Sequence, residues 1–203
     1  REDLIQLSPN HPQLGKLNID FKNLFASWFN RGFLVLRPIN WSSPAHILEK
    51  IITYESVHEI KNWDDLRRRL QPDDRRCFAF FHPAMPDEPL IFVEVALTEG
   101  TPDSIQNILL ESREVISADN ADTAAFYSIS NCQTGLAGIS FGNSLIKTVV
   151  QHLLRELPQI QNFVTLSPIP GLVKWLNETG LFDASADSET QMKLAASYLL
   201  NSK

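Results

Sequence analysis

One segment of the chain combines glycines, hydroxyl side chains and the start of a helical pattern, and this combination can bind an anion. It runs from Ser130 to Leu145 and holds three of the chain's eight glycines, namely Gly135, Gly138 and Gly142. Backbone N–H groups at the N-terminus of a helix attract phosphate, and glycines let a pyrophosphate approach the backbone closely. The alternative is a structural turn whose glycines serve helix–strand packing. These residues alone leave both interpretations open.

The glycine segment lacks the motifs of the common nucleotide-binding loops. It contains neither Gly-x-Gly-x-x-Gly nor a phosphate loop in which lysine precedes Ser or Thr. A dinucleotide-binding fold and an ATPase are therefore disfavoured.

A second segment, Thr165–Gly171, places a serine between a strand pattern and a proline-rich turn. Ser167 ends an apolar run that predicts a buried strand, and Pro168 and Pro170 follow it. A hydroxyl held in one direction can stabilise an oxyanion that develops during a reaction. The alternative is a serine that caps a helix or a turn. No Gly-x-Ser-x-Gly elbow surrounds Ser167, so a hydrolase triad is unsupported.

The remaining residues with chemical potential form no recognisable site. The five histidines show no metal-ligand spacing and the carboxylates form no acid–base pair, so no metal site is predicted. Cys77 and Cys132 lie in apolar, strand-like runs and are predicted to be buried free thiols. Free thiols are typical of a reducing compartment, and we expect a cytoplasmic protein.

Composition excludes several classes of protein. The chain has 203 residues, of which 43% are apolar and 21% charged, and its net charge is −6. These values are typical of a globular domain and argue against a nucleic-acid partner. The basic run 67–69 lies among aspartates, so we interpret it as a solvated helix face. No apolar stretch approaches the roughly 18 residues that span a membrane, so no membrane partner is predicted.

The elements that position these segments follow from the hydrophobic periodicity. Residues 1–19 are predicted to form a loose lead-in, and the 77–81 and 90–97 strands a hairpin whose loop contains three prolines. The predicted strands are 33–39, 77–81, 90–97, 124–130 and 163–167, and the predicted helices are 21–29, 44–52, 63–70, 105–109, 142–157, 172–176 and 194–200. This order predicts a mixed α/β (α+β) fold that is not built from regular βαβ units.

Several segments together resemble the malonyl-CoA decarboxylase family. They occur in the family's order from about residue 20 to about residue 176, which makes the resemblance more specific than any single motif. The segments are Trp41-Ser-Ser-Pro44, Glu55–Ile60, Arg75–His82, Glu88–Leu97, Phe126–Ser130, Gly135–Gly142 and Leu166–Gly171.

The resemblance implies a fold and a set of site residues. The family's catalytic domain has the fold of the GCN5-related N-acetyltransferases, in which a splayed mixed sheet admits a CoA thioester. The catalytic serine corresponds to Ser167. The CoA-contacting loop corresponds to Ala137, Gly138, Ile139, Ser140, Phe141, Gly142 and Asn143. No cofactor is expected, because the CoA thioester is the substrate and itself accepts electrons.

Two departures from known patterns limit what the resemblance implies. The family uses a histidine in a Phe-His-Leu-x-Asn-Gly stretch beyond the serine, and this sequence contains no such stretch. We therefore expect a fragment, with residues 1–32 as the remnant of a preceding helical domain and 33–203 as a catalytic domain incomplete at its C-terminus. The spacing of Gly138 and Gly142 also differs from the acetyltransferase signature Gln/Arg-x-x-Gly-x-Gly/Ala and matches the decarboxylase loop.

The resulting functional prediction is decarboxylation of malonyl-CoA to acetyl-CoA and CO2, a reaction of fatty acid metabolism, by a homo-oligomer. One alternative is an acyl-CoA-dependent N-acetyltransferase, which would need a base and an acceptor groove. The other is a non-catalytic acyl-CoA-binding or assembly module, which the missing histidine favours.

Overall fold

The chain divides into two units, of which the first, Arg1–Leu166, contains the sheet. The computed structural model describes residues 1–167, 169 and 171–179, so the predicted helix over 194–200 lies outside the described residues. The second unit begins at Ser167, and its described helix is α7, Leu172–Thr179.

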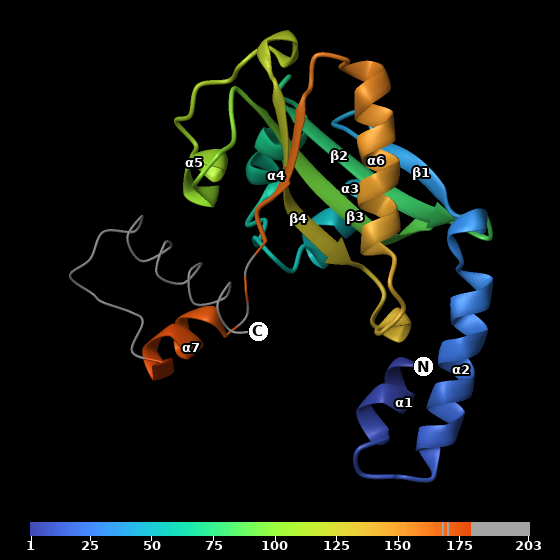
Figure 1. Ribbon diagram of the computed structural model, residues 1–203. Helices are drawn as coiled ribbons and strands as arrows, with labels where there is room; N and C mark the ends of the chain where they lie inside the picture. The colour runs from blue at the N-terminus through green and yellow to red at the C-terminus, as the bar shows by residue number, and fades with distance from the viewer. Residues whose placement is uncertain (168, 170, 180–203) are drawn as a thin grey trace. The chain divides into compact units, whose positions relative to one another are not determined.

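A five-stranded sheet forms the centre of the first unit, and its strands lie in the order in which they occur in the sequence (Figure 1). The first four strands are antiparallel, whereas β5 runs parallel to β4. A parallel pair needs a crossover, and helix α6, Gly142–Glu156, supplies it. The strands are β1 Val35–Ile39, β2 Arg75–His82, β3 Met85–Thr98, β4 Thr123–Asn131 and β5 Asn162–Thr165. The predicted mixed α/β class is confirmed.

Both faces of the sheet are buried, because successive strand residues alternate between two cores. Phe78 and Phe80 of β2 pack into the core that contains the apolar side of α6, which crosses the sheet in Figure 1. Cys77 and Phe81 pack instead against α3, Ala45–Tyr54, and α4, Trp63–Leu70. Cys77 and Cys132 are buried and free, as predicted, and burial raises the pKa of both thiols.

A β-bulge interrupts the pairing of β3 with β4. Glu94 pairs with Ser128 and Val95 pairs with Phe126, so Tyr127 is the extra residue. A bulge breaks the alternation of side chains along a strand. Tyr127 and Ser128 consequently both lie on the side of the sheet that α3 and α4 cover.

Strands β4 and β5 separate halfway along β4. Their pairing runs from Thr123 with Asn162 to Phe126 with Thr165, and the Leu166 N–H donates to the Phe126 carbonyl at 2.9 Å. β4 continues to Asn131 without β5 beside it. This separation is the splay of the sheet that the resemblance to the family implies.

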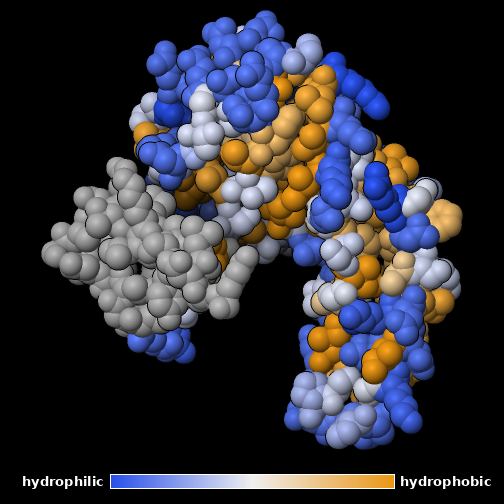
Figure 2. Space-filling view, viewed as in Figure 1, coloured by the Kyte–Doolittle hydropathy of each residue, from blue (hydrophilic) through white to orange (hydrophobic). Residues whose placement is uncertain are grey.

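The predicted loose lead-in is wrong, because residues 1–19 are largely helical. Helix α1 spans Glu2–Leu7 and α2 spans Leu14–Trp28, so the predicted 21–29 helix begins a full two turns earlier. The missed signal is an apolar repeat with spacings of three and four residues, at Leu14, Leu17, Phe21, Leu24 and Trp28. None of the residues of α1 or α2 is buried, and Figure 2 shows apolar side chains on the surface of these helices.

The predicted hairpin is confirmed, but its loop is shorter than expected. β2 ends at His82 and β3 begins at Met85, so Pro86 and Pro89 belong to β3. The register shifts around Phe81, which pairs with Pro89, while His82 pairs with Met85. Proline cannot donate a ladder hydrogen bond, and such an irregularity accommodates it.

The shorter helices follow their capping signals. The Asn62 side chain accepts a hydrogen bond from the Asp65 N–H at 2.9 Å and so caps the N-terminus of α4, which spans the predicted 63–70 helix. Helix α5, Ile105–Leu109, is capped by Ser104. Three short 3₁₀ helices complete the unit, η1 Arg31–Phe33, η2 Ala118–Asn120 and η3 Thr134–Leu136. In the described part of the chain, no helix has the length and apolar character needed to cross a membrane.

Candidate functional site

The predicted anion-binding loop connects β4 to α6, and its glycines have different roles. Gly138 has φ +78°, a left-handed conformation that glycine adopts without steric cost. Gly142 is the first residue of α6, where a β-carbon would lie 3.9 Å from Ile129 and Ile91, an ordinary contact. The loop therefore requires glycine for its conformation at Gly138 and not at Gly142.

Arg1 holds this loop against the N-terminal helices. Its Nη1 donates to the carbonyls of Gly135 at 2.8 Å and Ala137 at 2.7 Å. Its Nε donates to Asn18 Oδ1 on α2 at 2.9 Å. The glycine segment and α2 are thus connected through one side chain.

The N-terminus of α6 points unpaired N–H groups toward the loop. The first intrahelical bond runs from the Leu145 N–H to the Phe141 carbonyl at 2.9 Å. The N–H groups of the preceding helical residues have no partner within the helix, and the helix dipole makes this end electropositive. The first turn carries no acidic residue.

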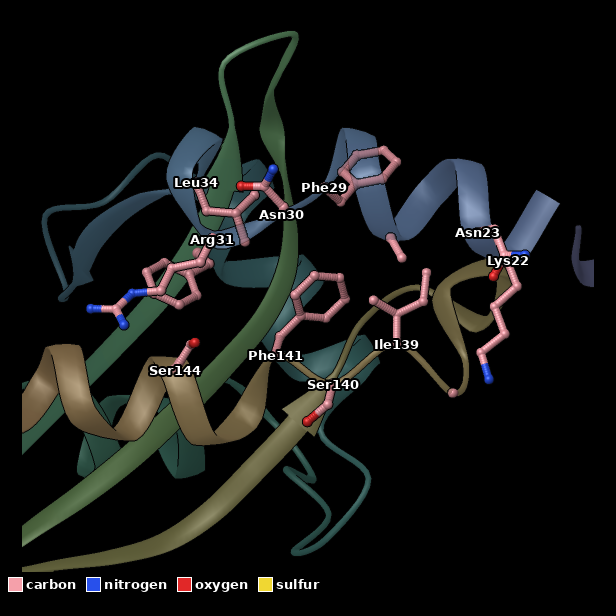
Figure 3. A pocket seen from close by; sticks show the side chains of 13 residues that line it. Lys22, Asn23, Phe29, Asn30, Arg31, Leu34, Ile139, Ser140, Phe141 and Ser144 are labelled. Carbon is pink, nitrogen blue, oxygen red and sulfur yellow. The ribbon is translucent and has the colours of Figure 1, made fainter. Parts of the chain in front are cut away.

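A cavity of about 370 Å³ opens beside this helix terminus, and we call it the loop pocket (Figure 3). Four of the seven loop residues predicted to contact CoA line it, namely Gly138, Ile139, Ser140 and Phe141. Ala137, Gly142 and Asn143 are not among its lining residues. The other side of the pocket is formed by α2, η1 and the residues that flank η1, with Lys22, Asn23, Ala26, Phe29, Asn30, Arg31 and Leu34.

Lys22 and Arg31 are the pocket residues that sequence reasoning missed. No carboxylate lines the loop pocket, and both cations are exposed. Neither makes an ion pair with any residue in the part of the chain that the structure describes. They lie far from the loop in the sequence, so only the fold brings them to it. The pocket can therefore bind an anion through side chains as well as backbone.

Ser167 lies at the start of the second unit, and its side chain is exposed. The predicted buried strand ending at Ser167 is wrong, since β5 ends at Thr165 and its residues are exposed or half-buried. The physical reason is that β5 is the edge strand of the described sheet, with β4 on one side of it. Pro168 and Pro170 lie outside the described residues.

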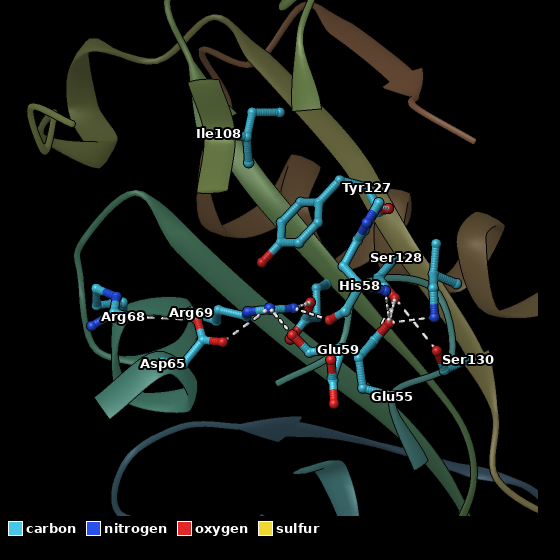
Figure 4. Close-up of polar contacts among 12 residues, drawn as sticks. Glu55, His58, Glu59, Asp65, Arg68, Arg69, Ile108, Tyr127, Ser128 and Ser130 are labelled. Carbon is cyan, nitrogen blue, oxygen red and sulfur yellow. Dashed lines mark hydrogen bonds and ion pairs between the residues drawn. The ribbon is translucent and has the colours of Figure 1, made fainter. Parts of the chain in front are cut away.

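A second group of polar residues lies on the opposite face of the sheet, beneath α3 and α4 (Figure 4). We call Glu55, Arg69, Glu94, Tyr127 and Ser128 the buried polar cluster. Glu55 accepts hydrogen bonds from the Val57 and His58 N–H groups, both at 2.8 Å, and from the Ser128 hydroxyl at 2.7 Å. The carboxylate thereby holds the turn after α3 against β4.

Arg69 is buried, so the prediction of a solvated basic face is wrong for this residue. It lies three residues after Leu66 and one before Leu70, on the inward side of α4. Its guanidinium is 3.2 Å from Glu94 and donates to the carbonyls of His58 at 2.8 Å and Glu59 at 3.0 Å. Four acceptors including Asp65 offset the cost of burying its charge.

Glu94 is fully buried in the central strand β3. Burial raises its pKa to about 7, the Arg69 guanidinium opposes this rise, and Glu55 adds to it. Glu94 Oε1, Arg69 Nε and the Tyr127 hydroxyl are buried without a hydrogen-bond partner among the described residues. The cluster thus contains a carboxyl group that titrates near neutral pH, and nothing in its sequence neighbourhood signals this.

His58 lies beside β4 at the point where β4 stops pairing with β5. Its Nε2 is 3.1 Å from the Tyr127 carbonyl, one residue beyond the last residue of β4 that pairs with β5. The described residues contain no group of three or more His, Cys, Asp or Glu side chains placed to hold a metal ion.

The fold and the loop pocket define a mixed α/β domain with a glycine-containing loop at a helix terminus. Residues 32–201 match the family model of the malonyl-CoA decarboxylase C-terminal domain, and residues 1–29 match that of the N-terminal domain. The chain therefore belongs to the malonyl-CoA decarboxylase family.

Individual relatives agree with this assignment. The chain is 47% identical over 177 residues to the mitochondrial malonyl-CoA decarboxylase of Anser anser anser, covering 86% of this chain and 35% of that one. The malonyl-CoA decarboxylase structure from Rhodopseudomonas palustris superposes with TM-score 0.86 and 54% identity, covering all of this chain and 56% of the other. For the Agrobacterium vitis structure the TM-score is 0.82 and the identity 56%, with 95% and 48% covered. The chain thus spans about half of these solved relatives and about a third of the curated one.

Proposed function

We propose that this chain carries the acyl-CoA site of a malonyl-CoA decarboxylase, which converts malonyl-CoA to acetyl-CoA and CO2. The observation that carries the proposal is the match to both family models, in order, along nearly the whole chain. The loop pocket supports it, because a cavity with two cations and no carboxylate suits a ligand with several phosphate groups.

In this proposal the 137–143 loop and the N-terminus of α6 bind the CoA pyrophosphate through backbone N–H groups. Gly138 lets the ligand approach, since its left-handed conformation and missing side chain keep the backbone accessible. Ser140 and Ser144 add hydroxyl groups at the pocket wall. Phe141, which is buried, fixes the start of the helix against the sheet.

Ser167 is proposed to act on the malonyl group. Decarboxylation breaks the bond between the α-carbon and the carboxylate carbon, and CO2 leaves. The electron pair moves into the thioester and forms an enolate, which then takes a proton at the α-carbon. A hydroxyl that donates to the enolate oxygen lowers the barrier of the first step. A general acid must supply the proton, and the resemblance to the family implies a histidine outside this sequence.

We also propose the finer features of the biological unit. Residues 1–32 would belong to a preceding helical domain and 33–203 to an incomplete catalytic domain, and the whole protein would be a homo-oligomer. A cytoplasmic location accords with the two buried free thiols, although the curated relatives are named as mitochondrial.

The proposal is tested by product analysis on this chain and on the longest natural polypeptide that contains it. Each is incubated with malonyl-CoA, and separately with acetyl-CoA and a set of amines. Equal amounts of acetyl-CoA and CO2 from malonyl-CoA, without free thiol, are expected from the longer polypeptide. Free thiol and an acetylated amine would indicate an acetyltransferase. Binding of malonyl-CoA without turnover by the longer polypeptide would indicate an acyl-CoA-binding module.

A further inference from the structure

The loop pocket contains two cations that the backbone-binding role of the loop does not use. Lys22 extends from α2 beside Gly138, and its Nζ would be 3.3 Å from a β-carbon at that glycine. Arg31 comes from η1, and Figure 3 shows it on the other side of the pocket, near Ser144 in the first turn of α6. Both belong to the segment that precedes β1, whereas the loop lies beyond β4.

The neighbourhood leaves both cations available to a ligand. Asn30 also lines the pocket, but both ends of its side-chain amide already have partners. Its Nδ2 donates to the Ser27 carbonyl, and its Oδ1 accepts from the Gly32 N–H. Lys22 and Arg31 form no ion pair with a carboxylate among the described residues. No carboxylate lines the pocket to compete with an anionic ligand for either cation.

The apolar residues between the two cations indicate the form of the ligand. Phe29, Ile139 and Phe141 lie between Lys22 and Arg31 in Figure 3. This arrangement fits a ligand in which sugar or base atoms separate two anionic groups. Coenzyme A has this form, because its pyrophosphate and the phosphate on its ribose are attached to different carbons of one sugar.

We infer that Lys22 and Arg31 bind phosphate groups of the CoA nucleotide, so that the segment before β1 forms half of the acyl-CoA site. This inference rests on the proposed function and adds to it the side chains that recognise the nucleotide. Guanidinium and ammonium groups form charge-assisted hydrogen bonds with phosphate oxygens. The Arg1 side chain, which ties α2 to the loop, keeps the two halves together.

The test is calorimetric binding of three ligands to the full chain: CoA, dephospho-CoA, which lacks the ribose phosphate, and pantetheine, which lacks all phosphates. The variants are Lys22→Met and Arg31→Met. Lys16→Met and Arg155→Met are matched controls, because both residues are exposed and lie outside the loop pocket. We expect each pocket variant to bind CoA about fivefold more weakly or worse. Pantetheine affinity and the unfolding midpoints should be unchanged.

The ligand series also identifies the phosphate that each cation binds. A variant whose weakening disappears with dephospho-CoA has lost a contact with the ribose phosphate, and one that weakens both ligands has lost a contact with the pyrophosphate. Wild-type binding of CoA with unchanged affinity in both pocket variants would overturn this inference alone. Failure of the wild-type chain to bind CoA would overturn the proposed acyl-CoA site as well.

Discussion

Lys22 Nζ lies 3.3 Å from the point that a β-carbon on Gly138 would occupy. The loop conformation and the pocket cation are therefore not independent, although one residue lies on α2 and the other beyond β4. Any side chain at position 138 requires a small shift of the lysine end, and a carboxylate there would also pair with it.

Gly138→Asp is expected to weaken CoA binding strongly, because it adds a negative charge at the pocket wall and pairs with Lys22, which is then less available to a phosphate. Its positive φ is unfavourable for other residues, so a loss of about 1 kcal/mol in the free energy of unfolding is expected as well. Calorimetry with CoA and urea denaturation measure the two effects. Gly100→Asp is the matched control, since Gly100 has φ +77° and lies outside the loop pocket. Equal CoA affinity in the two folded variants would contradict the site.

Glu94→Gln is expected to remove a pH dependence of stability. The pKa of Glu94 in the folded protein is about 7, above the ordinary value of about 4.3 in an unfolded chain. Between these two pKa values the folded state binds the Glu94 proton more tightly than the unfolded state does. The stability that this protonation contributes is therefore lost as pH rises through 7. Relative to the variant, the wild type should lose on the order of 3 kcal/mol between pH 4.5 and 8.5.

Urea denaturation of both proteins across this pH range measures the difference. The groups that face Glu94, namely Arg69, Tyr127, Glu55 and Cys77, are present in both proteins, so the comparison isolates the change at position 94. Parallel stability profiles would mean that Glu94 remains ionised throughout, held by Arg69.

Ser128→Ala is expected to destabilise the protein by about 1–3 kcal/mol, because it leaves the Glu55 carboxylate without its hydroxyl donor in a buried place. Ser42→Ala serves as the control, since the Ser42 hydroxyl donates to Asn40 on the exposed surface. Chemical denaturation of the two variants compares them directly. Equal losses would show that the Glu55 contact adds nothing beyond an exposed hydrogen bond.

The elements with strong local signals could be predicted from the sequence. The Asn62 cap fixes the start of α4, and the apolar face that includes Leu145, Val149 and Leu153 fixes α6. The hairpin of β2 and β3 also follows from local patterns. Its short loop does not, because Pro86 and Pro89 normally end a strand and are accommodated here by a shift in register.

The roles of residues that depend on tertiary contacts could not be predicted from the sequence. Arg69 lies in a run of three arginines. Its spacing from Leu66 and Leu70 places it on the inward side of α4, but its partner Glu94 comes from a distant strand and only the fold brings the two together. Lys22 likewise resembles any exposed lysine on a helix until the fold brings it to Gly138. The sequence indicated the loop because glycine spacing is a local signal, whereas the meeting of distant cations is not.

The proposed role of Ser167 is tested most directly by the steady-state kinetics of CO2 release from malonyl-CoA, measured on the longest natural polypeptide that carries this sequence. Loss of one donor to a developing oxyanion lowers the rate by on the order of 10²–10³. Ser167→Ala should therefore lower kcat by that factor with a smaller change in KM, and its unfolding midpoint should stay close to that of the wild type. Ser167→Thr, which keeps a hydroxyl, should retain more activity. Near-normal turnover of Ser167→Ala with a lowered unfolding midpoint would contradict the account and make Ser167 a structural residue.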